Sequence, residues 1–120
     1  MLRRVLAAGL VLAAVTSSHA WRIGGWVTDA ITGDSLEGVQ IKLSIVKSGP
    51  IVRPRIYYDT TGAKGTYEFS QSATTGEYDY ALTTSFSGYD PDTARNEDPL
   101  GATETDIVNF ELYPEGTSVG

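Results

Sequence analysis

An acidic segment near the C-terminal end carries the main candidates for metal binding in this 120-residue chain. Its carboxylate and amide oxygens are the hard ligands that calcium prefers in extracellular proteins. The candidate calcium ligands are Asp90, Asp92, Asn96 and Asp98. The spacing does not match an EF-hand loop, because no glycine follows the third ligand. A solvated acidic loop without metal is the alternative, and the composition favours it.

Aromatic residues give a second candidate site, for binding a sugar ring or a partner protein. Trp26 alternates with the inward-facing residues of its predicted strand, so its ring is expected on the outer face. Together with Tyr57 or Tyr58, such a ring would form a stacking surface. Cover of Trp26 by a loop or an edge strand is the favoured alternative, because large aromatic side chains are usually mostly buried.

Groups suited to general acid–base or nucleophilic catalysis are scarce. The chain has no cysteine, and its one histidine, His19, lies in a segment that is expected to be removed. Imidazole bases, thiolate nucleophiles and most zinc sites are therefore not expected. Glu77 and Asp79 share a strand face, where two carboxylates can form a glycosidase-type pair. The favoured interpretation is that both are charged side chains on the solvent-exposed face of the sheet. We expect no enzymatic activity, no catalytic residue and no cofactor other than calcium at the acidic segment.

The first 20 residues have the layout of a secretory signal peptide. Arg3 and Arg4 precede the apolar run 5–15, and Ser18-x-Ala20 supplies the small residues for cleavage after Ala20. An uncleaved anchor helix is the alternative. We expect an N-terminal signal-peptide helix and a product that is secreted, periplasmic or held at the cell surface, with no membrane span after cleavage.

The remaining residues suffice for one small domain, expected at 21–114, with a flexible tail at 115–120. Residues 21–120 contain seven basic and fifteen acidic side chains, so their net charge is −8 and nucleic acid is not an expected partner. The lack of cysteine means that this domain must fold without disulfide bonds.

Stretches that alternate apolar and polar residues predict an all-β domain. The strongest stretch places four branched side chains on one face: Val39, Ile41, Leu43 and Ile45. Further strands are expected at 21–27, 53–59, 65–69, 76–82 and 107–114. Residues 53–59 are expected at a sheet edge, because they include Pro54, and residues 88–106 are expected to form a long polar loop. Six or seven such strands hide their apolar faces best by stacking two sheets as a β-sandwich.

Several short motifs follow one another in a specific order along residues 23–114. They are Gly25-x-Val27-x-Asp29-Ala30-x-Thr32-Gly33-x-x-Leu36-x-Gly38-Val39-x-Ile41, Gly65-x-Tyr67-x-Phe69, Gly76-x-Tyr78-x-Tyr80-x-Leu82, Gly88-Tyr89 and Val108-x-Phe110-x-Leu112-x-Pro114. This pattern resembles the carboxypeptidase regulatory-like domain family, although Ser35 stands where that family usually has proline. The resemblance implies a seven-stranded antiparallel Greek-key sandwich of the transthyretin (prealbumin) type, used for folding support, partner contact or presentation.

The expected function is therefore that of a secreted, non-catalytic binding or scaffold module that contacts a protein or glycan partner. One alternative is a structural subunit of a cell-surface or extracellular assembly, which self-associates through the edge strand near residues 53–59. A carboxylate-based hydrolase is the less favoured alternative.

Overall fold

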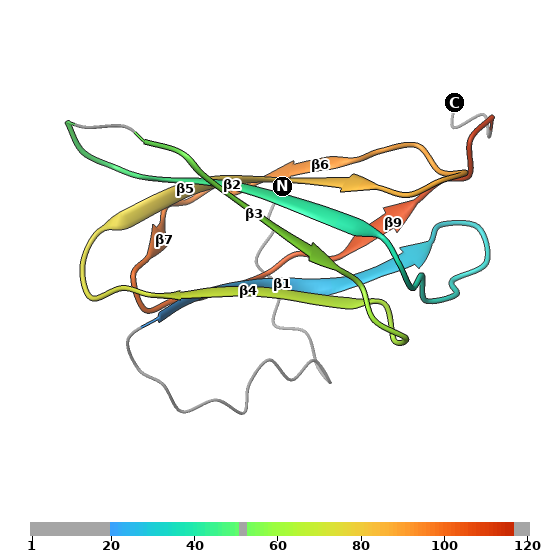
Figure 1. Cartoon of the computed structure of the whole chain (residues 1–120), viewed down its shortest axis with the longest axis horizontal. Helices are drawn as coiled ribbons and strands as arrows, with labels where there is room; N and C mark the ends of the chain where they lie inside the picture. Colours follow the sequence, from blue (N-terminus) through green and yellow to red (C-terminus); the bar gives the residue numbers. More distant parts are fainter. Residues whose placement is uncertain (1–19, 51–52, 117–120) are drawn as a thin grey trace.

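The computed structural model describes residues 20–50 and 53–116, which form two stacked β-sheets (Figure 1). The first sheet contains β1 (Ala20–Asp29), β4 (Thr66–Ser72), β8 (Thr105–Ile107) and β9 (Phe110–Leu112). The second contains β2 (Gln40–Lys47), β3 (Arg55–Thr60), β5 (Glu77–Ser85), β6 (Thr93–Arg95) and β7 (Leu100–Gly101). These two ranges contain no helix, and so none that could cross a membrane. The predicted all-β, two-sheet architecture is confirmed.

Strand direction differs between the two sheets. The second sheet has the order β3-β2-β5-β6 with antiparallel pairs throughout, and β3 lies at its edge as predicted for residues 53–59. In the first sheet β4 is antiparallel to β1, whereas β8 and β9 both run parallel to β1. The prediction of a purely antiparallel sandwich is therefore wrong for the C-terminal strands. The chain crosses from β7 to the end of the sandwich where β1 begins, and then follows β1 in the same direction (Figure 1).

A break at Val108 and Asn109 separates β8 from β9. The Asn109 Oδ1 accepts a hydrogen bond from the Trp26 backbone N–H at 2.9 Å, in place of a strand-to-strand bond. The Val108 carbonyl accepts one from the buried Tyr67 hydroxyl at 2.6 Å. Gly25 lies directly beneath both residues, and a Cβ there would collide with the Val108 carbonyl. Close backbone approach at Gly25 thus holds the last strand against β1.

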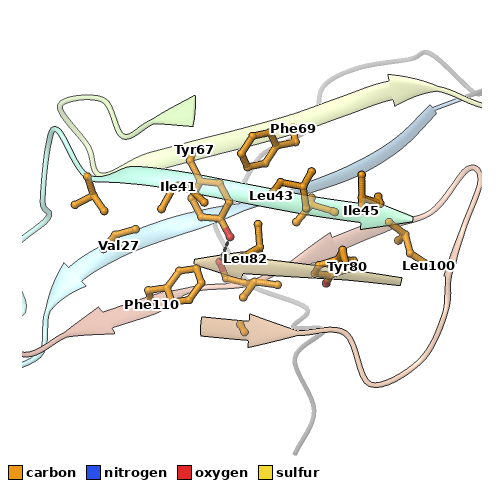
Figure 2. Packing of buried hydrophobic residues seen from close by; sticks show 14 of the residues in the cluster. Val27, Ile41, Leu43, Ile45, Tyr67, Phe69, Tyr80, Leu82, Leu100 and Phe110 are labelled. Atoms are coloured by element: carbon orange, nitrogen blue, oxygen red, sulfur yellow. Dashed lines mark hydrogen bonds between the residues drawn. The ribbon is translucent and has the colours of Figure 1, made fainter. Parts of the chain in front are cut away.

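One hydrophobic core fills the space between the sheets (Figure 2). The predicted inward face is confirmed, because Val39, just before β2, and Ile41, Leu43 and Ile45 of β2 are all buried. Burial of one such side chain stabilises the fold by about 1.5–3 kcal/mol. Tyr67 packs edge-on against Phe69 at 6.0 Å between ring centroids. Aliphatic side chains from the second sheet therefore meet aromatic side chains from the first.

Residues 88–106 are not the long loop predicted from their polar composition. They contain β6, β7 and the first two residues of β8. Ala94 of β6 and Leu100 of β7 are buried, at 3% and 0% exposure. Each of these strands spans only two or three residues and buries a single side chain: Ala94 in β6, Leu100 in β7 and the polar Asp106 in β8. This leaves no alternation for the sequence to display.

The predicted signal-peptide helix lies outside the described residues. Only its last residue, Ala20, is described, and it begins β1 opposite Ser72. At the other end, residues 115–116 form a turn and 117–120 lie outside the described residues. The Glu115 backbone N–H donates to the Gly88 carbonyl at 2.9 Å, which fixes the start of the predicted tail.

A buried carboxylate organises the turn after β1. Asp29 is 7% exposed, and its Oδ1 accepts the backbone N–H of Ile31 at 2.7 Å and of Thr32 at 2.9 Å. Its Oδ2 accepts the Tyr89 hydroxyl at 2.6 Å. The Tyr89 hydrogen bond, followed by the Thr32 N–H, lowers the pKa of Asp29 below 3.8. This carboxylate therefore stabilises the fold in its ionised form.

We expect Tyr89→Phe to weaken the acid dependence of stability. A lowered folded-state pKa contributes stability above the unfolded-state pKa, and this contribution is lost as the pH falls through the lowered value. Removing the hydroxyl brings the two pKa values of Asp29 closer together. Thermal melting between about pH 6 and pH 2 should therefore show a smaller fall in Tm for this variant. Tyr58→Phe, at a 60% exposed tyrosine, is the control and should keep the full slope. An unchanged slope in Tyr89→Phe would contradict this assignment.

Candidate functional site

A pocket of about 360 Å³ is lined by residues of both sheets at the end of the sandwich where β1 and β5 begin. This end lies on the left in Figure 1. Ligand-binding pockets commonly have volumes of about 300–1,000 Å³. Residues of β1 and β4 form one wall, and residues of β2, β3 and β5 form the other. The lining residues are Trp21, Ile45, Lys47, Arg53, Arg55, Tyr57, Gln71, Ser72 and Tyr78.

Three aromatic side chains, together with Ile45, form the apolar part of this pocket. Trp21 is 3% exposed, and its ring lies 6.4 Å from that of Tyr57 and 6.1 Å from that of Tyr78. The interplanar angles are 62° and 50°, so the two tyrosine rings meet the indole at an angle. Such aromatic contacts add about 0.5–1.5 kcal/mol each beyond the burial of area. They connect β1 to β3 and β5, and they fix the shape of the pocket.

The rim of the pocket is basic. Lys47, Arg53 and Arg55 line it, and no acidic residue does. These are three of the seven basic side chains in residues 21–120. Within 20–50 and 53–116, the ion pair that the structure contains joins Arg22 to Glu68, away from this rim. A chain with a formal charge of −6 therefore concentrates positive charge at one aromatic pocket.

Gly76 positions the side chain of Lys47. It has φ +103°, and a Cβ at this residue would collide with the Lys47 Cε and lie 3.3 Å from its Nζ. The missing side chain lets the stem of Lys47 lie flat over the turn that leads into β5. The backbone around this turn is held by the Ser48 N–H, which donates to the Glu77 carbonyl at 2.9 Å.

We expect Gly76→Ala to destabilise the protein by about 1–2 kcal/mol, the cost of a left-handed conformation for an L-residue. Gly88→Ala is the matched control, because Gly88 also has positive φ but no atom within 4 Å of its added Cβ. Both variants should lose similar stability in urea unfolding, since the flexible end of Lys47 moves aside. NMR shifts of the Lys47 Cε group should change in Gly76→Ala alone. A much larger loss in Gly76→Ala would contradict a mobile Lys47.

The predicted aromatic site of Trp26, Tyr57 and Tyr58 is not assembled. Trp26 is half-buried on the outer face of the first sheet, while β3 belongs to the second sheet. Neighbouring residues of a strand point to opposite faces, so Tyr57 lines the pocket and Tyr58 points outward, 60% exposed. Of the three residues, Tyr57 alone reaches the pocket.

The predicted calcium ligands are not assembled either. β6 is extended and separates Asp90 and Asp92 from Asn96 and Asp98. The Asn96 side chain is already engaged: its Oδ1 accepts the Tyr80 N–H at 2.9 Å, and its Nδ2 donates to the Asp98 carbonyl at 2.9 Å. No group of three or more His, Cys, Asp or Glu residues that could hold a metal occurs in the described part of the chain.

The carboxylates Glu77 and Asp79 lie on the exposed face of β5. Asp79 borders a shallow hollow of about 270 Å³ together with Arg95 and Asn96, whereas Glu77 does not line it. The two carboxylates therefore do not flank a common cleft, and a glycosidase-type pair is not formed.

Sequence reasoning missed most of the pocket. Trp21 is the start of the first predicted strand, but nothing local indicates that Tyr57 and Tyr78 meet it. Strand alternation is the signal that indicates the inward position of Trp21, because it lies on the same face of its strand as the buried Ile23 and Val27. Nothing local to the two arginines around Pro54 indicates a pocket either.

No protein-family model and no curated protein sequence matches this chain. Its fold is similar to solved dioxygenase structures. Catechol 1,2-dioxygenase from Pseudomonas arvilla C-1 is 11% identical with a TM-score of 0.63, over 87% of this chain and 55% of that one. 3-Chlorocatechol 1,2-dioxygenase from Rhodococcus opacus 1CP is 11% identical with a TM-score of 0.54, over 82% of this chain and 61% of that one. The dioxygenase domain of a carbohydrate-binding fusion protein from Streptomyces sp. SirexAA-E is 13% identical with a TM-score of 0.53, over 82% of this chain and 84% of that one.

These similarities correct three expectations. The sandwich is shared with domains of enzymes, which contradicts the expected non-catalytic binding or scaffold module and the expected lack of enzymatic activity. Chemistry with molecular oxygen is carried in proteins by haem, flavin, copper or non-haem iron, so the expected lack of a cofactor is contradicted as well. The chain spans 55% and 61% of the two catechol-type enzymes, so at this identity the fold is what they share.

The described residues do not fit a metal centre of that kind. Residues 20–50 and 53–116 include neither histidine nor cysteine, which are the usual nitrogen and sulfur ligands. Tyr57 and Tyr78 are the phenol groups at the pocket, and three cationic side chains line it with them. A metal cation would be repelled there, so no reaction step is derived through one.

Proposed function

We propose that the protein is an enzyme that acts on small aromatic compounds, and that the pocket at Trp21 is its substrate site. The observation that carries this proposal is an aromatic pocket at the open end of the sandwich, lined by Trp21, Tyr57 and Tyr78. Support comes from the similar fold of dioxygenases whose names specify catechol and chlorocatechol.

The pocket has the dimensions and surfaces that a single ring requires. A cavity of about 150 Å³ accommodates benzene, so the pocket volume of about 360 Å³ leaves room for ring substituents. The indole and the two phenol rings offer offset or edge-on contacts to a planar ligand. Gln71 and Ser72 of β4, on the same wall as Trp21, supply polar groups that can orient a ring hydroxyl. These residues bind and orient the substrate.

The two tryptophans provide a direct test, because they lie on opposite faces of β1. In the full chain with Trp26→Phe, the remaining Trp21 fluorescence should change when phenol, catechol or benzoate is added. In the full chain with Trp21→Phe, the remaining Trp26 should not respond. Equal responses from both variants, or none from either, would show that the pocket is not the binding site.

Turnover is tested separately from binding. Catechol and benzoate are incubated with the full chain, and ring absorbance and dissolved oxygen are followed, with and without added iron salts. We expect a change in the absorbance spectrum of the ring that Trp21→Phe slows and Trp26→Phe does not. A bound ring whose absorbance stays constant under all of these conditions would contradict the enzymatic part of the proposal.

Further features of the chain are also proposals. They are export directed by residues 1–20, membership of the carboxypeptidase regulatory-like family, and a Greek-key order of six to seven main strands. N-terminal sequencing of the exported protein would test the first of these, because cleavage after Ala20 would make Trp21, at the pocket, the new N-terminus.

A further inference from the structure

We infer that the substrate of this pocket is an aromatic carboxylate, an inference that rests on the proposed function. An aromatic floor alone suits a neutral ring such as phenol. The rim adds Lys47, Arg53 and Arg55 without any acidic lining residue. Outside the pocket, Arg22 is paired with Glu68 at 3.3 Å, but no ion pair in the described ranges engages the three rim cations. Uncompensated positive charge beside a ring-sized pocket selects a ring that carries negative charge.

The register of β2 and β3 places these cations for a carboxylate. Ile45 lies opposite Arg55, and Lys47 follows Ile45 on the same inward face, so Lys47 and Arg55 are diagonal neighbours. Diagonal neighbours across an antiparallel pair are separated by about 7–8 Å, a gap that a carboxylate can bridge. A guanidinium binds a carboxylate through two parallel hydrogen bonds, and an ammonium adds a point charge.

The acidic side chains nearest in sequence point away from this site. Glu77 and Asp79 flank Tyr78 on β5, and alternation directs them to the exposed face while Tyr78 lines the pocket. The chain as a whole repels anions, because its net charge is −6 even with the three rim cations included. The basic rim therefore attracts an anionic ring to one place on an otherwise unfavourable surface.

The test compares three probes on the full chain with Trp26→Phe, read by Trp21 fluorescence: benzoate, phenol and acetate. Benzoate should bind about tenfold more tightly than phenol or acetate, because it uses both the ring contacts and the cations. Lys47→Gln and Arg55→Gln should each weaken benzoate binding about tenfold and leave phenol binding unchanged. Lys42→Gln is the matched control, since it removes the same charge from the outward face of the same strand.

The possible results separate this inference from the proposed function. Equal binding of benzoate and phenol would leave the aromatic pocket standing and overturn the carboxylate. Acetate binding as tightly as benzoate, or an equal loss in Lys42→Gln, would also overturn it, because the ring or the local cations would then be irrelevant. Failure of all three probes would overturn the proposed function, and the inference with it.

Discussion

Replacing Gly25 by alanine should destabilise the protein by about 3 kcal/mol or more, at the upper end of the cost of overpacking a core. The added Cβ collides with the Val108 carbonyl and lies 2.6 Å from the Asn109 Oδ1. Both groups are backbone or tightly held, so neither can move aside cheaply. The same two atoms accept hydrogen bonds from the Tyr67 hydroxyl and the Trp26 N–H, which would be strained together.

Urea unfolding of Gly25→Ala against Gly62→Ala measures this effect. Gly62 has no atom within 4 Å of its added Cβ and no positive φ, so its substitution should change the free energy of unfolding by less than about 1 kcal/mol. Equal stability of the two variants would mean that the last strand does not press against β1 at Gly25. A fall in Tyr67 burial, seen as a lower phenol pKa, should accompany the loss, because burial raises the pKa of Tyr67 far above its usual value of 10.0.

The central strands were predictable from sequence because each carries several alternating side chains. Val39, just before β2, and the three buried residues of β2 repeat with a period of two, which the sequence displays directly. The short strands β6, β7 and β8 were not predictable, because they are defined by backbone pairing with strands distant in sequence: β6 and β7 with β5, and β8 with β1. The parallel direction of β8 and β9 was equally hidden, since it follows from where the chain crosses between sheets.

The pocket escaped prediction for a different reason. Its aromatic residues, Trp21, Tyr57 and Tyr78, come from three strands that lie far apart in sequence. The candidate sites from sequence relied on neighbours: one acidic segment for calcium, and one tyrosine pair for stacking. Strand alternation separates such neighbours onto opposite faces, as at Tyr57 and Tyr58. In a sandwich, a site is therefore built from residues whose side chains point to the same face of their strands and which lie at the same end of the sandwich.

The pocket lies at one end of the sandwich. The core is filled by side chains along its length, and every buried side-chain nitrogen or oxygen of the described residues has a hydrogen-bond partner. Functions that differ between proteins of one fold are set by groups placed on that scaffold. The dioxygenases that share this sandwich are longer than the present chain, which spans 55% of one and 61% of another. Under the proposed function, the pocket residues of this chain, rather than its fold, therefore decide its substrate.

Trp21→Ala should destabilise the protein by about 3–5 kcal/mol, the range for truncating a buried tryptophan. The indole is 3% exposed and contacts Tyr57 and Tyr78, so its loss leaves a cavity between the sheets at the pocket floor. Trp26→Ala is the matched control on the same strand, where a half-buried ring on the outer face should cost about 1 kcal/mol. Differential scanning calorimetry and urea unfolding measure both changes.

The pair of tryptophan variants also separates folding from binding. Below its lowered Tm, Trp21→Ala should remain folded by circular dichroism yet bind benzoate at least about tenfold more weakly, because the ring that forms the pocket floor is gone. Trp26→Ala should bind benzoate as the unmodified chain does, since its ring lies on the other face of β1. Isothermal titration calorimetry gives both affinities. Loss of binding in Trp26→Ala with retention in Trp21→Ala would move the site to the outer face, where the sequence alone placed it.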